Sequence, residues 1–424
     1  MTVMLPPRAA LCGAWLTAWL AALPLASHAQ AYKTGGVQLT FGNAVGFFAT
    51  DNEGPRTTEG EPNFTALYTP SLNLLTETPN SSLGLEAASN LRYGTASGNI
   101  GVTAPRLNGQ YRTSSANAGL ELTGQFRQRD LGEEKFAIRD TADRTDFVNG
   151  TATRQNTALE ANVDWGRASL AAFGLSARLN QTTYSSGDAS GLNGSSLSDN
   201  KRLTLGANTQ LDLNQALQLH GALGYSQFED DTSVDDSETY TLSTGISLDR
   251  PLGALSTEIT VTDSPGGQRY GWTAGRTLDL PLGPVTAQLG AMALPQDETV
   301  LIGSLSTLRT FAASALNFEL SRDVSSLNEQ NSERLTTQVL VGYTRALTRD
   351  TDFQVSLDAV HARDIATDSE SFDATFDAIY SRALTPDWTG DMGYSYRYLE
   401  DTLGDSAQAN TIYVSLRRKF VTSY

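Results

Sequence analysis

The chain has 424 residues, with 30 Lys and Arg against 47 Asp and Glu, so its formal net charge is −17 at pH 7. A protein this acidic is not expected to bind nucleic acid through electrostatic attraction to phosphates. Its only cysteine is Cys12, so we expect neither structural disulfides nor thiol chemistry.

The N-terminus has the pattern of a secretory signal peptide. Arg8 precedes an apolar stretch from Ala9 to Leu25, and Ser27-His28-Ala29 closes it with a small-x-small pattern. An apolar core of roughly 15 residues is too short for a stable membrane span. We therefore expect cleavage after Ala29, so that residues 1–29 are a signal peptide and residues 30–424 form a single exported domain.

The mature part of the sequence excludes a helical membrane protein, because no stretch in it approaches 18 consecutive apolar residues. Two classes remain. One is a large soluble β protein that is exported, and the other is a closed β-barrel in an outer membrane.

Apolar and polar residues alternate along most of the mature chain. In residues 388–398, Trp388, Met392 and Tyr394 have one parity, while Asp391 and Arg397 have the other. Successive side chains of a strand point to opposite faces, so this alternation predicts strands with one apolar and one polar face.

About twenty such segments of roughly 11–15 residues follow one another, long enough to cross a tilted bilayer. Their predicted starts are residues 37, 63, 82, 99, 117, 151, 169, 201, 216, 237, 253, 268, 284, 299, 313, 334, 351, 371, 388 and 409. Pro70 and Pro105 fall inside two of them, where a missing N–H interrupts the ladder, so we expect a bulge or a shifted boundary there.

The connectors alternate between short turns, such as RPLG and TPDW, and mostly longer, acidic loops, such as 131–150 and 229–238. The pattern predicts an all-β fold: a transmembrane antiparallel up-and-down β-barrel of 18–20 strands, with 20 as the preferred count, and with short periplasmic turns and longer extracellular loops. The alternative, a soluble β-sandwich, typically has strands of about five or six residues, which are shorter than these segments. A propeller or solenoid would show a stricter repeat.

The C-terminal segment carries a resemblance to a known family. Residues 411–420 read TIYVSLRRKF, with Ile412, Val414 and Phe420 on one face. This resembles the last strand of bacterial outer-membrane β-barrel proteins, which alternates and ends in an aromatic residue read by the insertion machinery. Phe420 or Tyr424 could serve as that insertion signal. Strand one begins close to the expected cleavage site, so a receptor with a large N-terminal plug is not expected.

The resemblance implies a location in the outer membrane of a Gram-negative bacterium. It also implies contact with outer-membrane lipids and lipopolysaccharide, and passage through periplasmic chaperones and the barrel-insertion machinery. The resemblance concerns architecture and does not name a transported solute.

The polar parity of the strands predicts the residues that line the lumen. Burial of their charges in a dry core would be prohibitive, so a water-filled interior is expected. The predicted lumen-lining residues are Arg92, Glu121, Arg127, Arg129, Glu160, Asp164, Asp373, Asp377, Asp391 and Arg397. The alternative is that these charges pair with one another and stiffen a wall that conducts little.

The sequence offers little support for catalysis. The mature chain keeps two histidines. His220 is expected to face the lumen and His361, near Asp364, the outer surface, where a lone histidine is usually a solvated residue. The acidic run 229–238 lacks the spacing and turn glycine of a calcium loop, so a solvated loop is expected rather than a metal site. No cofactor is predicted.

One octapeptide occurs twice, as YTRALTRD at residues 343–350 and YSRALTPD at residues 380–387. We interpret each copy as the end of a strand at the periplasmic interface, followed by a turn. Aromatic rings of a barrel gather at such interfaces, and the predicted girdle consists of Trp165, Tyr343, Tyr380 and Trp388.

These features predict a porin-like protein that is not an enzyme and passes hydrophilic solutes. A second hypothesis is a structural or assembly component of a surface-polysaccharide export system without general pore activity. An outer-membrane hydrolase is the weakest hypothesis.

Overall fold

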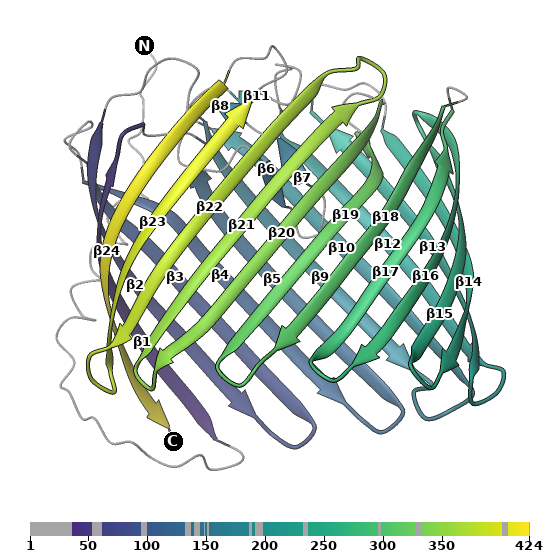
Figure 1. The fold of residues 1–424 in the computed structure, drawn as a ribbon, viewed down its shortest axis with the longest axis horizontal. Coiled ribbons are helices and arrows are strands. Elements are labelled where there is room, and N and C mark those ends of the chain that lie inside the picture. Colours follow the sequence, from purple (N-terminus) through teal and green to yellow (C-terminus); the bar gives the residue numbers. More distant parts are fainter. Residues whose placement is uncertain are drawn as a thin grey trace, which may run out of the picture.

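The computed structural model of the chain is a closed β-barrel (Figure 1). It describes residues 36–52, 62–94, 100–131, 137–139, 145–147, 149–150, 152–185, 189–190, 198–231, 236–295, 298–327, 332–400 and 406–423. The predicted signal peptide, residues 1–29, and Tyr424 lie outside them. No helix in this described part is long and apolar enough to cross a membrane.

Twenty antiparallel strands form the wall. The first ten are β1 (Val37–Thr50), β2 (Asn63–Glu77), β3 (Ser81–Gly94), β4 (Ile100–Ser114), β5 (Ala118–Asp130), β9 (Thr153–Trp165), β10 (Ala171–Ser185), β12 (Asn200–Asp212), β13 (Leu217–Asp230) and β14 (Ser237–Arg250). The other ten are β15 (Gly253–Ser264), β16 (Gly267–Leu280), β17 (Gly283–Ala293), β18 (Thr299–Thr310), β19 (Ser314–Leu327), β20 (Ser332–Thr348), β21 (Thr351–Asp364), β22 (Glu370–Ala383), β23 (Trp388–Glu400) and β24 (Ser406–Ser423).

Four short strands lie in the connections: β6 (Ala137–Arg139) pairs with β7 (Thr145–Phe147), and β8 (Asn149–Gly150) pairs with β11 (Ala189–Ser190). In Figure 1 the β6–β7 hairpin is drawn within the outline of the barrel. The predicted 20-stranded up-and-down barrel is confirmed, and every predicted strand start lies within three residues of an observed one.

The barrel closes between its first and last strands. β1 pairs with β24 from Gln38↔Ser423 to Thr50↔Thr411. Both ends of the wall therefore lie at one rim, which also carries the short connections and which we call the turn end. At the opposite rim, the loop end, Asn410 donates from its backbone N and its Nδ2 to the Asp51 carboxylate, each at 2.7 Å. These bonds join β1 and β24 where their pairing ends at the loop end.

Two turns at the turn end share the sequence Pro-Leu-Gly, at residues 251–253 and 281–283. Gly253 and Gly283 have φ values of 112° and 130°, a region that side chains with a Cβ avoid. A Cβ on either would collide with a carbonyl oxygen of the neighbouring hairpin, that of Thr277 or of Leu308. Glycine is therefore required at both positions by the backbone and by the close approach of the next strand.

The loop end is not uniformly long. The connection from β1 to β2 spans residues 51–62, whereas β15 and β16 are joined by only Pro265 and Gly266. β15, β17 and β18 are also the shortest strands of the wall, at 11 or 12 residues. The rim is therefore low over β15 to β18, a fifth of the barrel.

The irregularity expected near the early prolines is present at Pro105 but not at Pro70, where the β2–β3 register is the same on both sides, at Tyr68↔Leu91 and Ser71↔Ala88. The β3–β4 register shifts between Ala88↔Arg106 and Asn90↔Thr103, and Ala104, just before Pro105, has a φ of 50°. An extra residue reverses which parity faces outward. Val102 above the bulge and Leu107 below it are accordingly both exposed. The strand count is unaffected.

The repeated octapeptide forms two different turns. In the first copy β20 continues to Thr348, with a register shift at Leu347, and only Arg349 and Asp350 connect it to β21. In the second copy β22 ends at Ala383 and four residues connect it to β23. In this longer turn the Leu384 N–H donates to the Trp388 carbonyl at 2.9 Å. Both copies lie at the turn end, as the interpretation of the repeat requires.

Candidate functional site

The candidate site is the inner face of the barrel. One face of most strands carries large exposed apolar side chains, such as Leu289 and Leu301, which are 75% and 74% exposed. The other face is polar, and there side chains of non-neighbouring strands meet. His220 Nε2 of β13 lies 3.2 Å from Glu258 Oε2 of β15, above Gly245 of β14. Such an approach across an intervening strand requires a concave surface, so we assign the polar face to the lumen.

Arginines dominate one wall of the lumen. This basic wall consists of β3, β4, β5, β9, β10 and β12, and its arginines are Arg92, Arg106, Arg112, Arg127, Arg129, Arg154, Arg178 and Arg202. Cross-strand register sets Arg106 directly opposite Arg127, and Arg129 directly opposite Arg154. Like charges facing each other across strands destabilise a sheet, so this arrangement is unusual for a purely structural wall.

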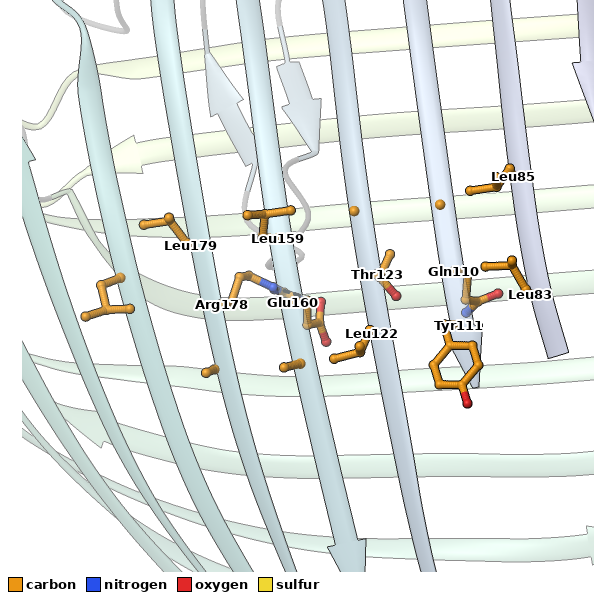
Figure 2. A pocket seen from close by; sticks show the side chains of 15 residues that line it. Leu83, Leu85, Gln110, Tyr111, Leu122, Thr123, Leu159, Glu160, Arg178 and Leu179 are labelled. Atoms are coloured by element: carbon orange, nitrogen blue, oxygen red, sulfur yellow. Dashed lines mark hydrogen bonds and ion pairs between the residues drawn. The ribbon is translucent and has the colours of Figure 1, made fainter. Parts of the chain in front are cut away.

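Each carboxylate that sequence reasoning placed on the basic wall has an arginine beside it. Glu121 Oε1 lies 2.9 Å from Arg112 Nη2, and Arg178 Nε donates to Glu160 Oε2 at 3.0 Å. Asp164 accepts from Arg167, which stands in the turn after β9. Figure 2 shows Arg178 and Glu160 reaching toward each other from neighbouring strands.

A mostly apolar hollow of about 560 Å³ opens on the same wall, lined by leucines such as Leu85, Leu122 and Leu159 (Figure 2). Those three leucines have the outward parity, and Gly109 and Gly124 face each other between them. The hollow is therefore part of the apolar outer surface and not of the lumen.

Carboxylates dominate the wall across the lumen. This acidic wall consists of β19 to β23, and its acidic residues include Glu319, Asp323, Asp352, Asp358, Asp364, Asp373, Asp377 and Asp391. It also carries arginines: Arg397 Nη2 lies 3.7 Å from Asp373 Oδ2, and Arg417 of the adjoining β24 donates two bonds of 2.7 Å to Asp391. In the strand order β5 and β19, and β12 and β22, stand ten positions apart. The two walls are therefore opposite each other, as Figure 1 shows.

The inner face is open at the turn end and covered at the loop end. Along β21, the inward-facing Asp352 and Gln354 are exposed, Asp358 is half-buried, and Ala362 and Asp364 are buried. β22 follows the same gradient, from half-buried Asp377 to buried Asp373. The lumen therefore narrows toward the loop end.

Sequence reasoning missed several arginines of the basic wall. Arg106 and Arg112 lie beyond the bulge at Pro105, where the parity of the strand reverses. Arg178 has the same parity as Asn180 and Thr182 in a regularly alternating strand, and this signal was available in the sequence. The sequence carries no comparable signal that the basic and acidic walls lie opposite each other, because this depends on the order of the strands in the closed barrel.

The structure gives no support to a hydrolytic site. His361 lies on the outward parity of β21, with Nε2 3.5 Å from Glu370 Oε2. Of the acidic run 229–238, Glu238 accepts bonds from the Tyr225 and Tyr240 hydroxyls. Within the described ranges, no group of three or more His, Cys, Asp or Glu side chains is placed to hold a metal ion.

The predicted girdle residues and Phe420 lie near the turn end, whereas the other predicted insertion residue, Tyr424, lies outside the described residues. Trp165 ends β9 and stacks on Phe173 with ring centroids 5.8 Å apart. Tyr343 and Tyr380 lie near the ends of β20 and β22. The Arg418 guanidinium lies 5.0 Å from the Trp388 ring and 4.1 Å from the Phe420 ring.

A scan against protein-family models finds no match, and a search of curated proteins finds no relative. The chain is similar in fold to the siderophore receptor PirA from Pseudomonas aeruginosa, at 11% identity and a TM-score of 0.50, over 92% of this chain and 81% of the receptor. It is also similar to the ferric-catecholate import receptor Fiu from E. coli K12, at 8% identity and a TM-score of 0.51, over 92% and 82% of the two chains. The closed barrel has the fold of bacterial outer-membrane β-barrel proteins.

Proposed function

We propose that the chain forms a water-filled channel in the outer membrane of a Gram-negative bacterium and lets hydrophilic solutes pass passively. The proposal rests on one observation above all, the charged inner face of a closed barrel. An ion that is moved into a dry interior loses several kcal/mol or more of hydration. A lumen lined by this many arginines and carboxylates is stable only if it is wet.

The width of the barrel supports the same function. Barrels of about 16–18 strands leave an aqueous channel, whereas about eight strands leave room only for side chains. With twenty strands, the lumen of this chain is wide enough for solutes as well as water. The opposed basic and acidic walls create a field across the lumen, which would orient polar solutes as they pass.

The proposal includes the route to the membrane. Residues 1–29 act as a cleaved signal peptide, and the barrel reaches the outer membrane through periplasmic chaperones and the insertion machinery. Phe420 or Tyr424 is the residue that this machinery recognises. The apolar outer face then contacts lipid and lipopolysaccharide, with the turn end in the periplasm.

Planar-bilayer recording of the refolded mature protein tests the proposal. We expect discrete conductance steps, and we expect liposomes that contain the protein to swell in solutions of small sugars but not of large ones. A heat-denatured sample is the control for both measurements. Refolded protein with the spectrum of β-structure that gives no steps and no swelling would contradict the channel.

A further inference from the structure

The β19–β20 hairpin leaves the barrel wall at its upper end. β18 and β19 pair from Thr310↔Ala315 up to Gly303↔Arg322 and not beyond. Above this point β18 still pairs with β17, up to Ala293↔Thr299, and β19 still pairs with β20, up to Leu327↔Ser332. The wall therefore forks between β18 and β19, although both strands continue.

Side chains satisfy backbone groups that the fork releases. Arg322 Nε donates to the Leu301 carbonyl at 3.1 Å, and its Nη1 donates to Thr337 Oγ1 at 3.3 Å. The Val324 N–H donates to Asp323 Oδ1 at 2.8 Å. Unpaired backbone groups are costly when they are buried, so these bonds stabilise the fork as a defined feature of the wall.

Above the fork, the hairpin bends inward. Val324 and Leu335 have the parity that faces outward lower on the same strands, yet they are only 5% and 4% exposed. They belong to one buried apolar cluster with Met292, Val300 and Ile302, which lie on the inward parity of β17 and β18. The outer side of the hairpin thus lies on the inner side of the low rim.

A buried ion pair fastens the hairpin in this position. Glu333 of β20 accepts a bond from Ser264 Oγ of β15 at 2.9 Å and another from Arg269 Nη1 of β16. The three residues are at most 8% exposed, and β16 and β20 are four positions apart in the wall. Separating the two partners of a buried ion pair would leave each charge buried without compensation, which is strongly destabilising. The pair therefore opposes movement of the hairpin away from β15 and β16.

We propose that the upper β19–β20 hairpin is an inward-folded lip that sets the size of the loop-end opening, and that the Arg269–Glu333 pair is its latch. The inference rests on the proposed channel function and adds the element that limits solute size. The lip accounts for the covered inner face over β15 to β18, where the rim itself is too low to enclose the lumen.

Glu333→Gln, which keeps the size of the side chain but removes its charge, tests the latch. We expect the open-channel conductance to rise about twofold or more, with a larger size limit for polyethylene glycols, since conductance follows the width of the narrowest section. The exchange Arg269→Glu with Glu333→Arg should restore the wild-type values. Glu238→Gln is the control, because Glu238 lies at the same rim on the outer face. Wild-type conductance and size limit in Glu333→Gln would overturn the lip.

A second measurement does not depend on conduction. Met292→Cys places a thiol on the inner face beneath the lip, and the only natural cysteine, Cys12, lies in the predicted signal peptide. A bulky maleimide should label it slowly in the otherwise wild-type protein and quickly with Glu333→Gln. Thr286→Cys, on the same face of β17 nearer the turn end, should be labelled equally in both.

The two measurements separate the two proposals. Faster labelling of Met292→Cys with Glu333→Gln, in a protein that never conducts, would support the lip and contradict the channel. Conductance with equal labelling of Met292→Cys in both backgrounds would support the channel and overturn the lip.

Discussion

Replacement of Leu289 by arginine is expected to cost the barrel about 2–4 kcal/mol of folding free energy in a lipid bilayer. Leu289 lies in the middle of β17, and its side chain is 75% exposed on the apolar face. If that face contacts lipid, a guanidinium there has no water and no partner within the bilayer. Denaturant unfolding of the protein in lipid vesicles measures the change.

Gln288→Arg is the matched control, because it puts the same side chain one residue away on the opposite face of the same strand. The Gln288 side chain donates to Thr273 Oγ1 at 2.8 Å on the lumen side, where an arginine can remain hydrated. Its expected cost is within about 0.5 kcal/mol. Similar losses for the two variants would contradict the assignment of the faces, and with it the wet lumen.

The wall of the barrel was predictable from the sequence because its strands have one apolar and one polar face. In β14, Tyr240, Leu242 and Ile246 alternate with threonine, serine and glycine along the whole strand. No such strand can slip by one residue without exposing its polar face to lipid. Alternation therefore located the strands, and the turn residues between them located their ends.

The fork between β18 and β19 could not be predicted in this way. Alternation continues through Val324 and Leu335, so parity alone places both side chains on the outer face, although the structure buries them against the inner face. The inward hairpin is joined to β16 by a contact between Glu333 and Arg269, which are 64 residues apart. Pairwise contacts over such a distance depend on the register and curvature of the closed barrel.

Register also decided which charges meet. Glu160 and Arg178 are 18 residues apart, and only the length of the turn between β9 and β10 sets them directly opposite each other. The repeated octapeptide also shows that similar sequences do not fix the turn, since one copy forms a two-residue turn and the other a four-residue turn. The second copy has Pro386 where the first has Arg349, and proline cannot donate a backbone hydrogen bond.

Asp391→Ala is expected to cost about 2–3 kcal/mol of folding free energy, less than a fully buried pair because the Arg417 side chain remains half-exposed. Asp391 is buried and accepts four hydrogen bonds, from the Ser381 and Ser415 hydroxyls and twice from Arg417. The two serines lie directly opposite Asp391, on β22 and β24, and Arg417 lies two residues further along β24, opposite Thr389. Without the carboxylate, these donors lose a shared acceptor beside the closing strand.

Unfolding of the refolded protein in denaturant, followed by the loss of its heat-modifiable migration on gels, measures this cost. Asp387→Ala removes a carboxylate from the exposed turn before the same strand and should change stability by no more than about 0.5 kcal/mol. Asp391→Asn keeps the size and one acceptor oxygen of the side chain but removes its charge, so it should fall between the two. If Asp391→Ala and Asp387→Ala unfolded at the same denaturant concentration, the hydrogen bonds at Asp391 would add nothing to the stability of the barrel beyond what bonds to water supply. The three strands would then be held together at this point by their backbone ladders alone.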